Sequence, residues 1–159
     1  MALYYLDTSA LVKLYFQEPG TAAMQRLAAA PRARLAISSL GVLEFQAAVR
    51  ARQRARTLAA RAAAGVLEHF RQREAHGLLR QILTEAAFDV AALLLDRHPL
   101  RAPDALQLAG CVTLHRTQPG SALYFVCADA TLLDAARAEQ IPHWNPATGA
   151  PAPGWILQT

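Results

Sequence analysis

Residues 3–16 read LYYLDTSALVKLYF, and the pattern of apolar residues changes at Asp7. The residues before Asp7 form a short, mostly apolar run that favours a strand. After Asp7 the apolar residues recur at helical spacing, which predicts a helix over residues 8–16 with Lys13 at its exposed edge. A carboxylate at this junction has two explanations. It caps the helix by accepting backbone hydrogen bonds, or it belongs to a site that concentrates negative charge.

The rest of the chain continues this alternation of short apolar strands and helices. Further strands are predicted at residues 35–37, 78–83, 123–127 and 142–144, and further helices at 21–30, 39–55, 58–74, 84–97, 103–115 and 129–139. This order is typical of an α/β fold in which helices cover both faces of a short, mainly parallel sheet, giving three α/β/α layers. We expect one such domain over residues 1–145, followed by a Pro- and Gly-rich tail over 146–159.

The composition is that of a globular domain. The 159 residues are 53% hydrophobic and 18% charged, which suffices for one core and excludes a disordered chain. No apolar run is long enough for a membrane span, and the N-terminus lacks a signal-peptide pattern, so we expect a cytoplasmic protein without a membrane partner. Cys111 and Cys127 provide neither a disulfide framework nor a metal-ligand cluster.

Positive charge is concentrated in one segment of the chain. Residues 50–80 contain eight arginines and two glutamates, a net charge of +6, whereas the remainder carries −2. The segment is either a solvated helix face or a surface for an anionic partner. Arg50 and Arg54 lie one helical turn apart, and such like-charge pairs are mildly destabilising unless an anionic partner relieves them.

Three further carboxylates occupy positions that need an explanation. Asp129 follows the strand predicted at 123–127, and Asp104 lies in the first turn of a helix, where the helix dipole favours an acid. Glu44 lies within a broad apolar stripe of the helix predicted at 39–55. Burying an unpaired charge there is expensive. Glu44 therefore needs a cation, hydrogen-bond donors or a route to solvent.

Parallel sheets bind their ligands at the carboxyl ends of the strands. We therefore expect Asp7, Glu44, Asp104 and Asp129 to converge, and their mutual repulsion requires compensation. Hard oxygen ligands suit Mg²⁺ or Mn²⁺, and the sequence has no Cys/His cluster that would indicate zinc. Such a site can activate water for an in-line displacement at phosphorus.

The ordered motifs of the chain resemble those of the PIN domain, in particular the VapC-type toxins of prokaryotic toxin–antitoxin pairs. They are LDTSALVKLYFQEPG from Leu6, ISSLGVLEFQAAV from Ile37, HPLRAPDALQLAG from His98 and FVCADATLLDAA from Phe125. Together they span nearly all of the chain up to Trp144. The resemblance implies a compact α/β/α domain that cuts RNA with Mg²⁺ or Mn²⁺ held by acidic residues.

The resemblance also implies roles for individual residues. The catalytic acids would be, in chain order, Asp7, Glu44, Asp104 and Asp129, with Asp7, Asp104 and Asp129 binding the metal. Thr8 or Ser9 would help to orient the first acid or a metal-bound water. Members of the family are commonly homodimers and are inhibited by a small antitoxin, which inserts a segment into the acidic groove.

Two residues depart from the family pattern. Cys127 stands where Thr or Ser is common, and a thiol is a poorer hydrogen-bond partner for the region of Asp129. Pro103 removes a backbone donor close to Asp104. Arginines near the third acid either meet phosphates or offset the local carboxylates. The candidate contacts to RNA or antitoxin are Arg97, Arg101, Arg50 and Arg54.

The sequence thus predicts a metal-dependent endoribonuclease, the toxin of a toxin–antitoxin pair. One alternative is another metal-dependent phosphoesterase, although Ser9 stands where a second Asp would be expected in a phosphatase. The other alternative is a non-catalytic PIN-like module whose basic helix binds RNA or protein.

Overall fold

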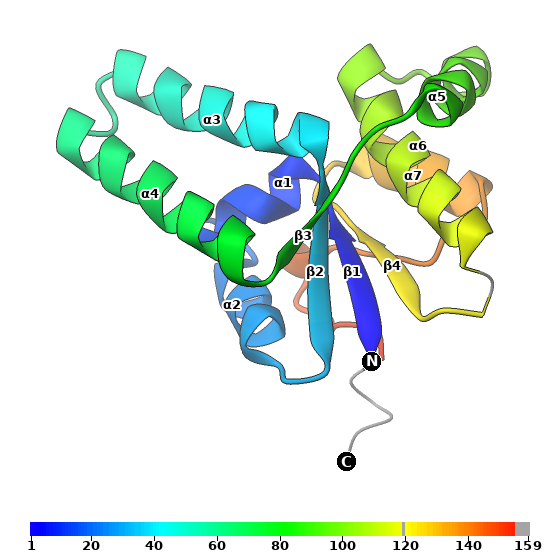
Figure 1. Ribbon diagram of the computed structural model, residues 1–159, viewed down its shortest axis with the longest axis horizontal. Coiled ribbons are helices and arrows are strands. Elements are labelled where there is room, and N and C mark those ends of the chain that lie inside the picture. The colour runs from blue at the N-terminus through cyan, green and yellow to red at the C-terminus, as the bar shows by residue number, and fades with distance from the viewer. Residues whose placement is uncertain (119, 155–159) are drawn as a thin grey trace.

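The computed structural model describes residues 1–118 and 120–154, and its centre is a five-stranded sheet in the order β3-β2-β1-β4-β5 (Figure 1). The strands are β1 (Ala2–Leu6), β2 (Ala33–Ser38), β3 (Leu78–Gln81), β4 (Leu123–Val126) and β5 (His143–Trp144). Every neighbouring pair of strands is parallel. The carboxyl ends of all five strands therefore lie along the same edge of the sheet.

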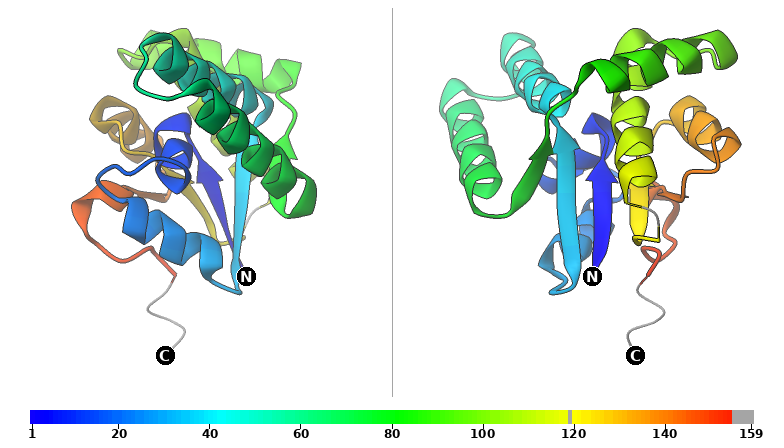
Figure 2. Two further views of the ribbon diagram at one scale, coloured as in Figure 1. Left: turned by 90° about the vertical axis from the view of Figure 1, so that its left-hand side faces the viewer. Right: turned by 45° about the vertical axis from the view of Figure 1, so that its right-hand side comes forward.

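Helices cover the sheet on both faces, so the predicted three-layer α/β/α fold is confirmed (Figures 1 and 2). The first face carries α1 (Thr8–Leu11), the 3₁₀ turn η1 (Val12–Leu14), α2 (Thr21–Ala29), α3 (Ser39–Arg54) and α4 (Ala60–His76). The second face carries α5 (Glu85–Arg97), α6 (Ala102–Thr117) and α7 (Ala130–Ala138). Figure 1 shows α3 and α4 side by side, extending beyond the sheet.

Each face of the sheet has its own core because successive strand residues point to opposite sides. Tyr4 belongs to the first core and Tyr5 to the second. In the second core, α6 packs closely on the sheet at Gly110. A Cβ atom added at Gly110 would overlap the Tyr5 hydroxyl, so the absence of a side chain permits this approach. The close packing brings the first turns of α6 next to the end of β1.

The region after Asp7 differs from its prediction. The helix expected over residues 8–16 is too long, because α1 ends at Leu11 and only the tighter turn η1 follows. The prediction that Lys13 is exposed is wrong. Lys13 is buried, and its ammonium lies 3.3 Å from a carboxylate oxygen of Glu18, which also pairs with Arg52 at 2.7 Å. The ion pair with Glu18 supplies the partner that the buried Lys13 needs.

The described part of the C-terminal segment packs on the domain. The 3₁₀ turn η2 (Pro146–Thr148) follows β5, Ala152 is buried in the first core, and the Tyr4 hydroxyl donates to the Pro153 carbonyl at 2.6 Å. Residues 155–159 of the predicted tail and residue 119 of the turn before β4 lie outside the described residues. Within the described ranges, no helix has the length and hydropathy needed to cross a membrane.

Candidate acidic site at the carboxyl edge of the sheet

The four predicted acids line one groove at the carboxyl edge of the sheet. Asp7 directly follows β1, Asp129 lies just after β4, Glu44 projects from α3, and Asp104 comes from the first turn of α6. The lining is completed by Thr8, Ser9, Ala47 and Arg101, and the groove has a volume of about 360 Å³. The structure therefore brings together residues that are up to 122 positions apart in the sequence.

Asp7 is buried, with only 6% of its surface exposed. Its Oδ2 accepts the backbone N–H of Ser9 at 2.9 Å and so caps α1. Burial raises the pKa of the Asp7 carboxyl and outweighs the hydrogen bonds from Ser9, which lower it, while the charge of Glu44 raises it further. Both explanations offered by the sequence thus apply, since Asp7 is a helix cap and also a wall of the acidic groove.

Glu44 is held by donors from two other elements. Its Oε2 accepts the Thr8 hydroxyl at 2.6 Å and the Gln107 side-chain amide at 2.6 Å. The prediction that Glu44 lies inside a buried apolar stripe is wrong, because the neighbouring Leu43 is 64% exposed and Ala47 is also exposed. The sequence indicated that Glu44 needs a cation, hydrogen-bond donors or a route to solvent. In the structure Glu44 has the donors and the route to solvent.

Asp104 forms an ion pair with Arg101. Arg101 Nε lies 2.8 Å from one carboxylate oxygen of Asp104, and an Nη lies 3.3 Å from the other. The Arg101 side chain is 81% exposed, so this contact is screened by solvent. Among the described residues, none forms an ion pair with Asp7, Glu44 or Asp129. One arginine thus faces four acids in this groove.

Asp129 and Cys127 organise the loop between β4 and α7. Asp129 is exposed, and its carboxylate caps α7 by accepting the N–H of Leu132 at 2.8 Å. The Cys127 sulfur accepts the N–H of Asp129 at 3.2 Å, and the Ser9 hydroxyl oxygen accepts the N–H of Ala128 at 2.9 Å. Burial raises the pKa of the Cys127 thiol. A protonated thiol and a serine therefore hold the backbone of this loop.

The remaining predicted cationic contacts lie outside the groove lining. Arg97 pairs with Glu139 at 3.0 Å, and His98 lies 2.9 Å from the same carboxylate. Arg50 and Arg54 are exposed on α3. Only Arg101 among the predicted contacts therefore reaches the acids directly.

Gln107 contacts the groove residues, although the sequence patterns did not predict it. Gln107 is 1% exposed, and its amide contacts Glu44, Thr8 and Ser38. The sequence did contain one indication, namely that Gln107 is a polar residue beside Leu108 in a largely apolar helix. A polar side chain buried at such a position needs hydrogen-bond partners.

The chemistry of the groove fits a hard divalent cation. Its potential ligands are carboxylate and hydroxyl oxygens, the donors that Mg²⁺ and Mn²⁺ prefer. As the side chains lie, however, no three Asp, Glu, His or Cys residues within the described ranges are close enough to hold a metal ion together. Asp104 is turned toward Arg101. The guanidinium of Arg101 therefore competes with a cation for the carboxylate of Asp104.

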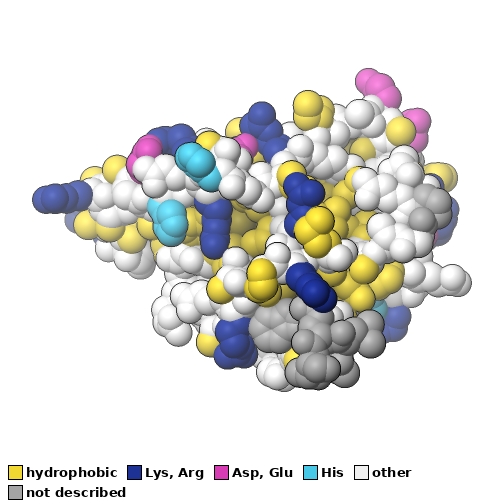
Figure 3. All heavy atoms as spheres, turned by 60° about the horizontal axis from the view of Figure 1, so that its bottom comes forward, with side chains coloured by type: hydrophobic (Ala, Val, Ile, Leu, Met, Phe, Trp, Pro, Cys, Tyr) yellow, Lys and Arg dark blue, Asp and Glu magenta, His cyan; other side chains and the backbone are white. Residues whose placement is uncertain are grey.

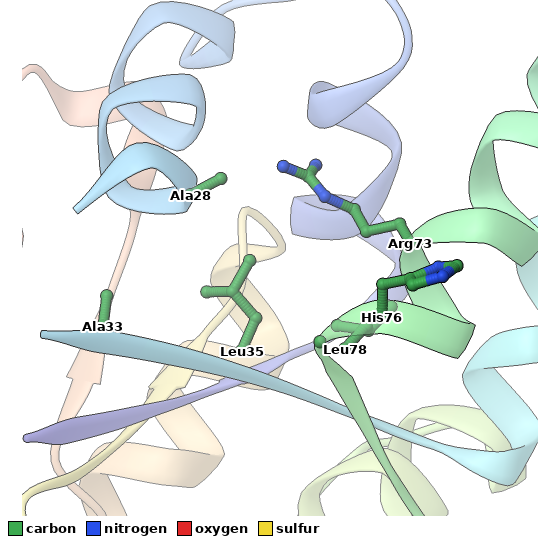
Figure 4. A pocket seen from close by; sticks show the side chains of 7 residues that line it. Ala28, Ala33, Leu35, Arg73, His76 and Leu78 are labelled. Atoms are coloured by element: carbon green, nitrogen blue, oxygen red, sulfur yellow. The ribbon is translucent and has the colours of Figure 1, made fainter. Parts of the chain in front are cut away.

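A second hollow, of about 190 Å³, lies near the amino ends of β2 and β3 (Figure 4). Arg73 extends from α4 toward Ala28 over its apolar floor, His76 also lines it, and no carboxylate among the described residues does. Figure 3 shows the face at which the strands begin, where basic side chains are scattered and acidic ones lie at the margin. This second hollow does not share the chemistry of the acidic groove.

The protein is therefore an α/β/α domain with a parallel sheet. Its carboxylates gather beyond the carboxyl ends of the strands, which is where such sheets bind their ligands. The family model of the PIN domain matches residues 4–117, and the chain belongs to this family. The family resemblance inferred from the motifs is thereby confirmed.

Solved structures share the fold at low sequence identity. VapBC2 from Rickettsia felis, bound to a promoter DNA fragment, has a TM-score of 0.63 and 16% identity, covering 90% of this chain and 98% of its own. A toxin–antitoxin complex from Klebsiella pneumoniae has a TM-score of 0.61 and 18% identity over 92% and 98%. VapC20 from Mycobacterium tuberculosis, a sarcin–ricin loop cleaving toxin, has a TM-score of 0.60 and 20% identity over 83% and 94%. The comparison with curated proteins found no match.

Proposed function

We propose that this protein is a metal-dependent endoribonuclease that hydrolyses RNA phosphodiester bonds and acts as the toxin of a toxin–antitoxin pair. The observation that carries the proposal is the convergence of four acids from separate elements on one groove, whose lining among the described residues contains a single cationic side chain. Membership of the PIN domain family supports nuclease activity. The similar fold of a toxin described as cleaving the sarcin–ricin loop supports RNA as the substrate.

Asp7, Asp104 and Asp129 are the residues that would hold Mg²⁺ or Mn²⁺ in this groove. When bound, such an ion supplies charge neutralisation at phosphorus and lowers the pKa of water. The buried Asp7 has a fixed orientation because Ser9 donates its backbone N–H to Oδ2. Asp104, which pairs with Arg101, would turn toward the cation, and Asp129 would contribute from the solvent-exposed side of the groove.

Glu44 and Arg101 complete the proposed catalytic groove. Thr8 anchors Glu44 through Oε2, and Oε1 accepts no hydrogen bond within the described residues, so it is available to the reacting groups. If Asp104 turns toward a cation, the guanidinium of Arg101 would be free to contact a phosphate of the RNA, a pairing that this planar group favours.

The partners follow from the same groove and from the similar folds. Solved toxin–antitoxin complexes with this fold support a small antitoxin as partner, and an acidic groove suits a basic antitoxin segment. We also propose a homodimer, supported by exposed apolar side chains such as Phe88 on α5 and Ile82 after β3, which are 53% and 71% exposed. A toxin that cuts cellular RNA acts in the cytoplasm.

The decisive experiment compares Mg²⁺-dependent RNA cleavage by the wild type and by two variants, Asp7→Asn and Asp104→Asn. Both variants are expected to lose cleavage while their circular dichroism spectra remain those of the wild type. Asp134→Asn is the matched control, because Asp134 is an exposed acid that pairs with Arg137 outside the groove. Unchanged cleavage by both groove variants would refute the proposal.

The same assays separate the alternative functions. Faster turnover of a small phosphate ester than of RNA would indicate another metal-dependent phosphoesterase. RNA binding without any calorimetric signal for Mn²⁺ would instead indicate a non-catalytic PIN-like binding module.

A further inference from the structure

We propose that Gln107 is a positioning residue that sets the orientation of the Glu44 carboxylate through a directed chain of hydrogen bonds from Ser38. The role in cleavage rests on the proposed function, whereas the hydrogen-bond chain can be measured without RNA or metal. Gln107 lies on α6, Ser38 caps α3, and Glu44 is one and a half turns further along α3. This chain of hydrogen bonds thus connects α3, which carries Glu44, to α6, which carries Asp104.

The chain of hydrogen bonds begins at Ser38. The backbone N–H of Gly41 donates to the Ser38 hydroxyl oxygen at 2.8 Å, as the helix cap requires. The single hydroxyl proton of Ser38 then donates to Oε1 of Gln107 at 2.7 Å. Because this contact engages the carbonyl end of the amide, the amino end must face the groove.

The side-chain nitrogen of Gln107 donates into the groove. Nε2 lies 2.6 Å from Oε2 of Glu44 and 3.1 Å from the Thr8 hydroxyl oxygen. The Thr8 hydroxyl in turn donates to the same Oε2 at 2.6 Å. Oε2 of Glu44 receives two hydrogen bonds, and Oε1 is left for the groove.

Burial makes this arrangement hard to rearrange. Ser38 is fully buried and Gln107 is 1% exposed. Rotating the amide would place its oxygen against the carboxylate oxygen of Glu44, which can only accept hydrogen bonds, and buried polar groups without partners are costly. A leucine at position 107 has a similar size but offers no hydrogen bond. It would leave Glu44 with the Thr8 hydroxyl alone and free to turn.

Gln81 is a second glutamine of the protein that serves as a matched control. Gln81 also anchors α6, since its Nε2 donates to the Gly110 carbonyl at 3.1 Å and its Oε1 accepts the Tyr5 hydroxyl at 2.8 Å. Gln81 makes no hydrogen bond to any residue of the groove. A variant at Gln81 therefore disturbs the packing of α6 without removing a donor from Glu44.

The kinetic test compares Gln107→Leu with Gln81→Leu at a temperature at which both variants are folded. Gln107→Leu is expected to lower kcat for RNA cleavage at least tenfold with KM changed less than threefold, whereas Gln81→Leu keeps kcat within threefold of the wild type. An equal loss in the two variants would reduce Gln107 to a packing residue and overturn the proposal. Unchanged kcat in Gln107→Leu would overturn it as well.

A second readout needs neither activity nor the folding of a Gln107 variant. In the ¹H–¹⁵N spectrum of the metal-free protein, the side-chain amide of Gln107 is expected to have widely separated protons that exchange slowly with solvent. Glu44→Ala should shift one of them, and Asp134→Asn should shift neither. Signals like those of exposed glutamines would overturn the proposal. If the wild type shows this amide but cleaves no RNA, the proposed function fails and the positioning of Glu44 stands.

Discussion

Replacing Asp7 with Asn is expected to stabilise the fold while it abolishes RNA cleavage. The amide oxygen of Asn can still accept the N–H of Ser9, and Asn is as good a helix cap as Asp. The substitution therefore keeps the shape and the cap. It removes only the negative charge of a residue that is 6% exposed and lies near Glu44.

The expected effect has a defined sign and pH dependence. Burial raises the pKa of Asp7 above its ordinary value of 3.8, so the folded protein keeps this proton to a higher pH than the unfolded chain does. The contribution of protonated Asp7 to folding stability is complete below the pKa that Asp7 has in the unfolded chain. This contribution is lost as the pH rises through the pKa of Asp7 in the folded protein. Each pKa unit corresponds to about 1.4 kcal/mol at neutral pH. For a domain of this size, 1 kcal/mol changes Tm by about 2–4 °C.

The assay is thermal denaturation of the wild type and Asp7→Asn between pH 3.5 and pH 8 in the presence of EDTA. The variant should have the higher Tm at pH 8, and the difference should shrink toward pH 3.5. Asp134→Asn, at an acid whose side chain is 71% exposed, should show no such trend. A lower Tm for Asp7→Asn at pH 8, or a difference that does not vary with pH, would refute this reasoning.

Three further predictions concern the groove, the core and the basic helix. Arg101→Ala should tighten Mn²⁺ binding in calorimetry because it frees Asp104, and an unchanged affinity would contradict the exchange of partners. Gly110→Ala should destabilise the fold by about 1–3 kcal/mol through overpacking. Gly65→Ala, with open space around it on α4, should stabilise it by up to about 1 kcal/mol, and equal Tm values would argue against this packing. Arg50→Gln should raise KM for RNA and weaken its salt dependence at constant kcat, and an unaltered salt dependence would show that RNA does not cross α3.

Local sequence patterns predicted the parts of the site that depend on local structure. Asp7 and Asp129 were found because each follows an apolar strand and caps a helix, and Asp104 because it lies in a first helical turn. The ion pair between Arg101 and Asp104 is also local, since the two residues are three positions apart. Such relations extend over one turn or one junction and leave a signal in the sequence.

The features that the sequence did not predict depend on contacts between distant segments. The periodicity of α3 marks Leu43 as apolar, but only the packing of α3 shows that this face opens onto a groove. Gln107 finds its partners 63 and 99 residues away. Arg97 pairs with an acid 42 residues further along the chain. Periodicity reports which face is apolar, and it contains no information about what that face meets.

The central claim is that separate carboxylates act together on one hard cation, and the position of Mn²⁺ in a crystal of the wild type tests it most directly. We predict anomalous density in the groove, with oxygen ligands from Asp7 and from Asp104 or Asp129, and with Asp104 turned away from Arg101. An empty groove at saturating Mn²⁺, with the arginine still on Asp104, would contradict the claim.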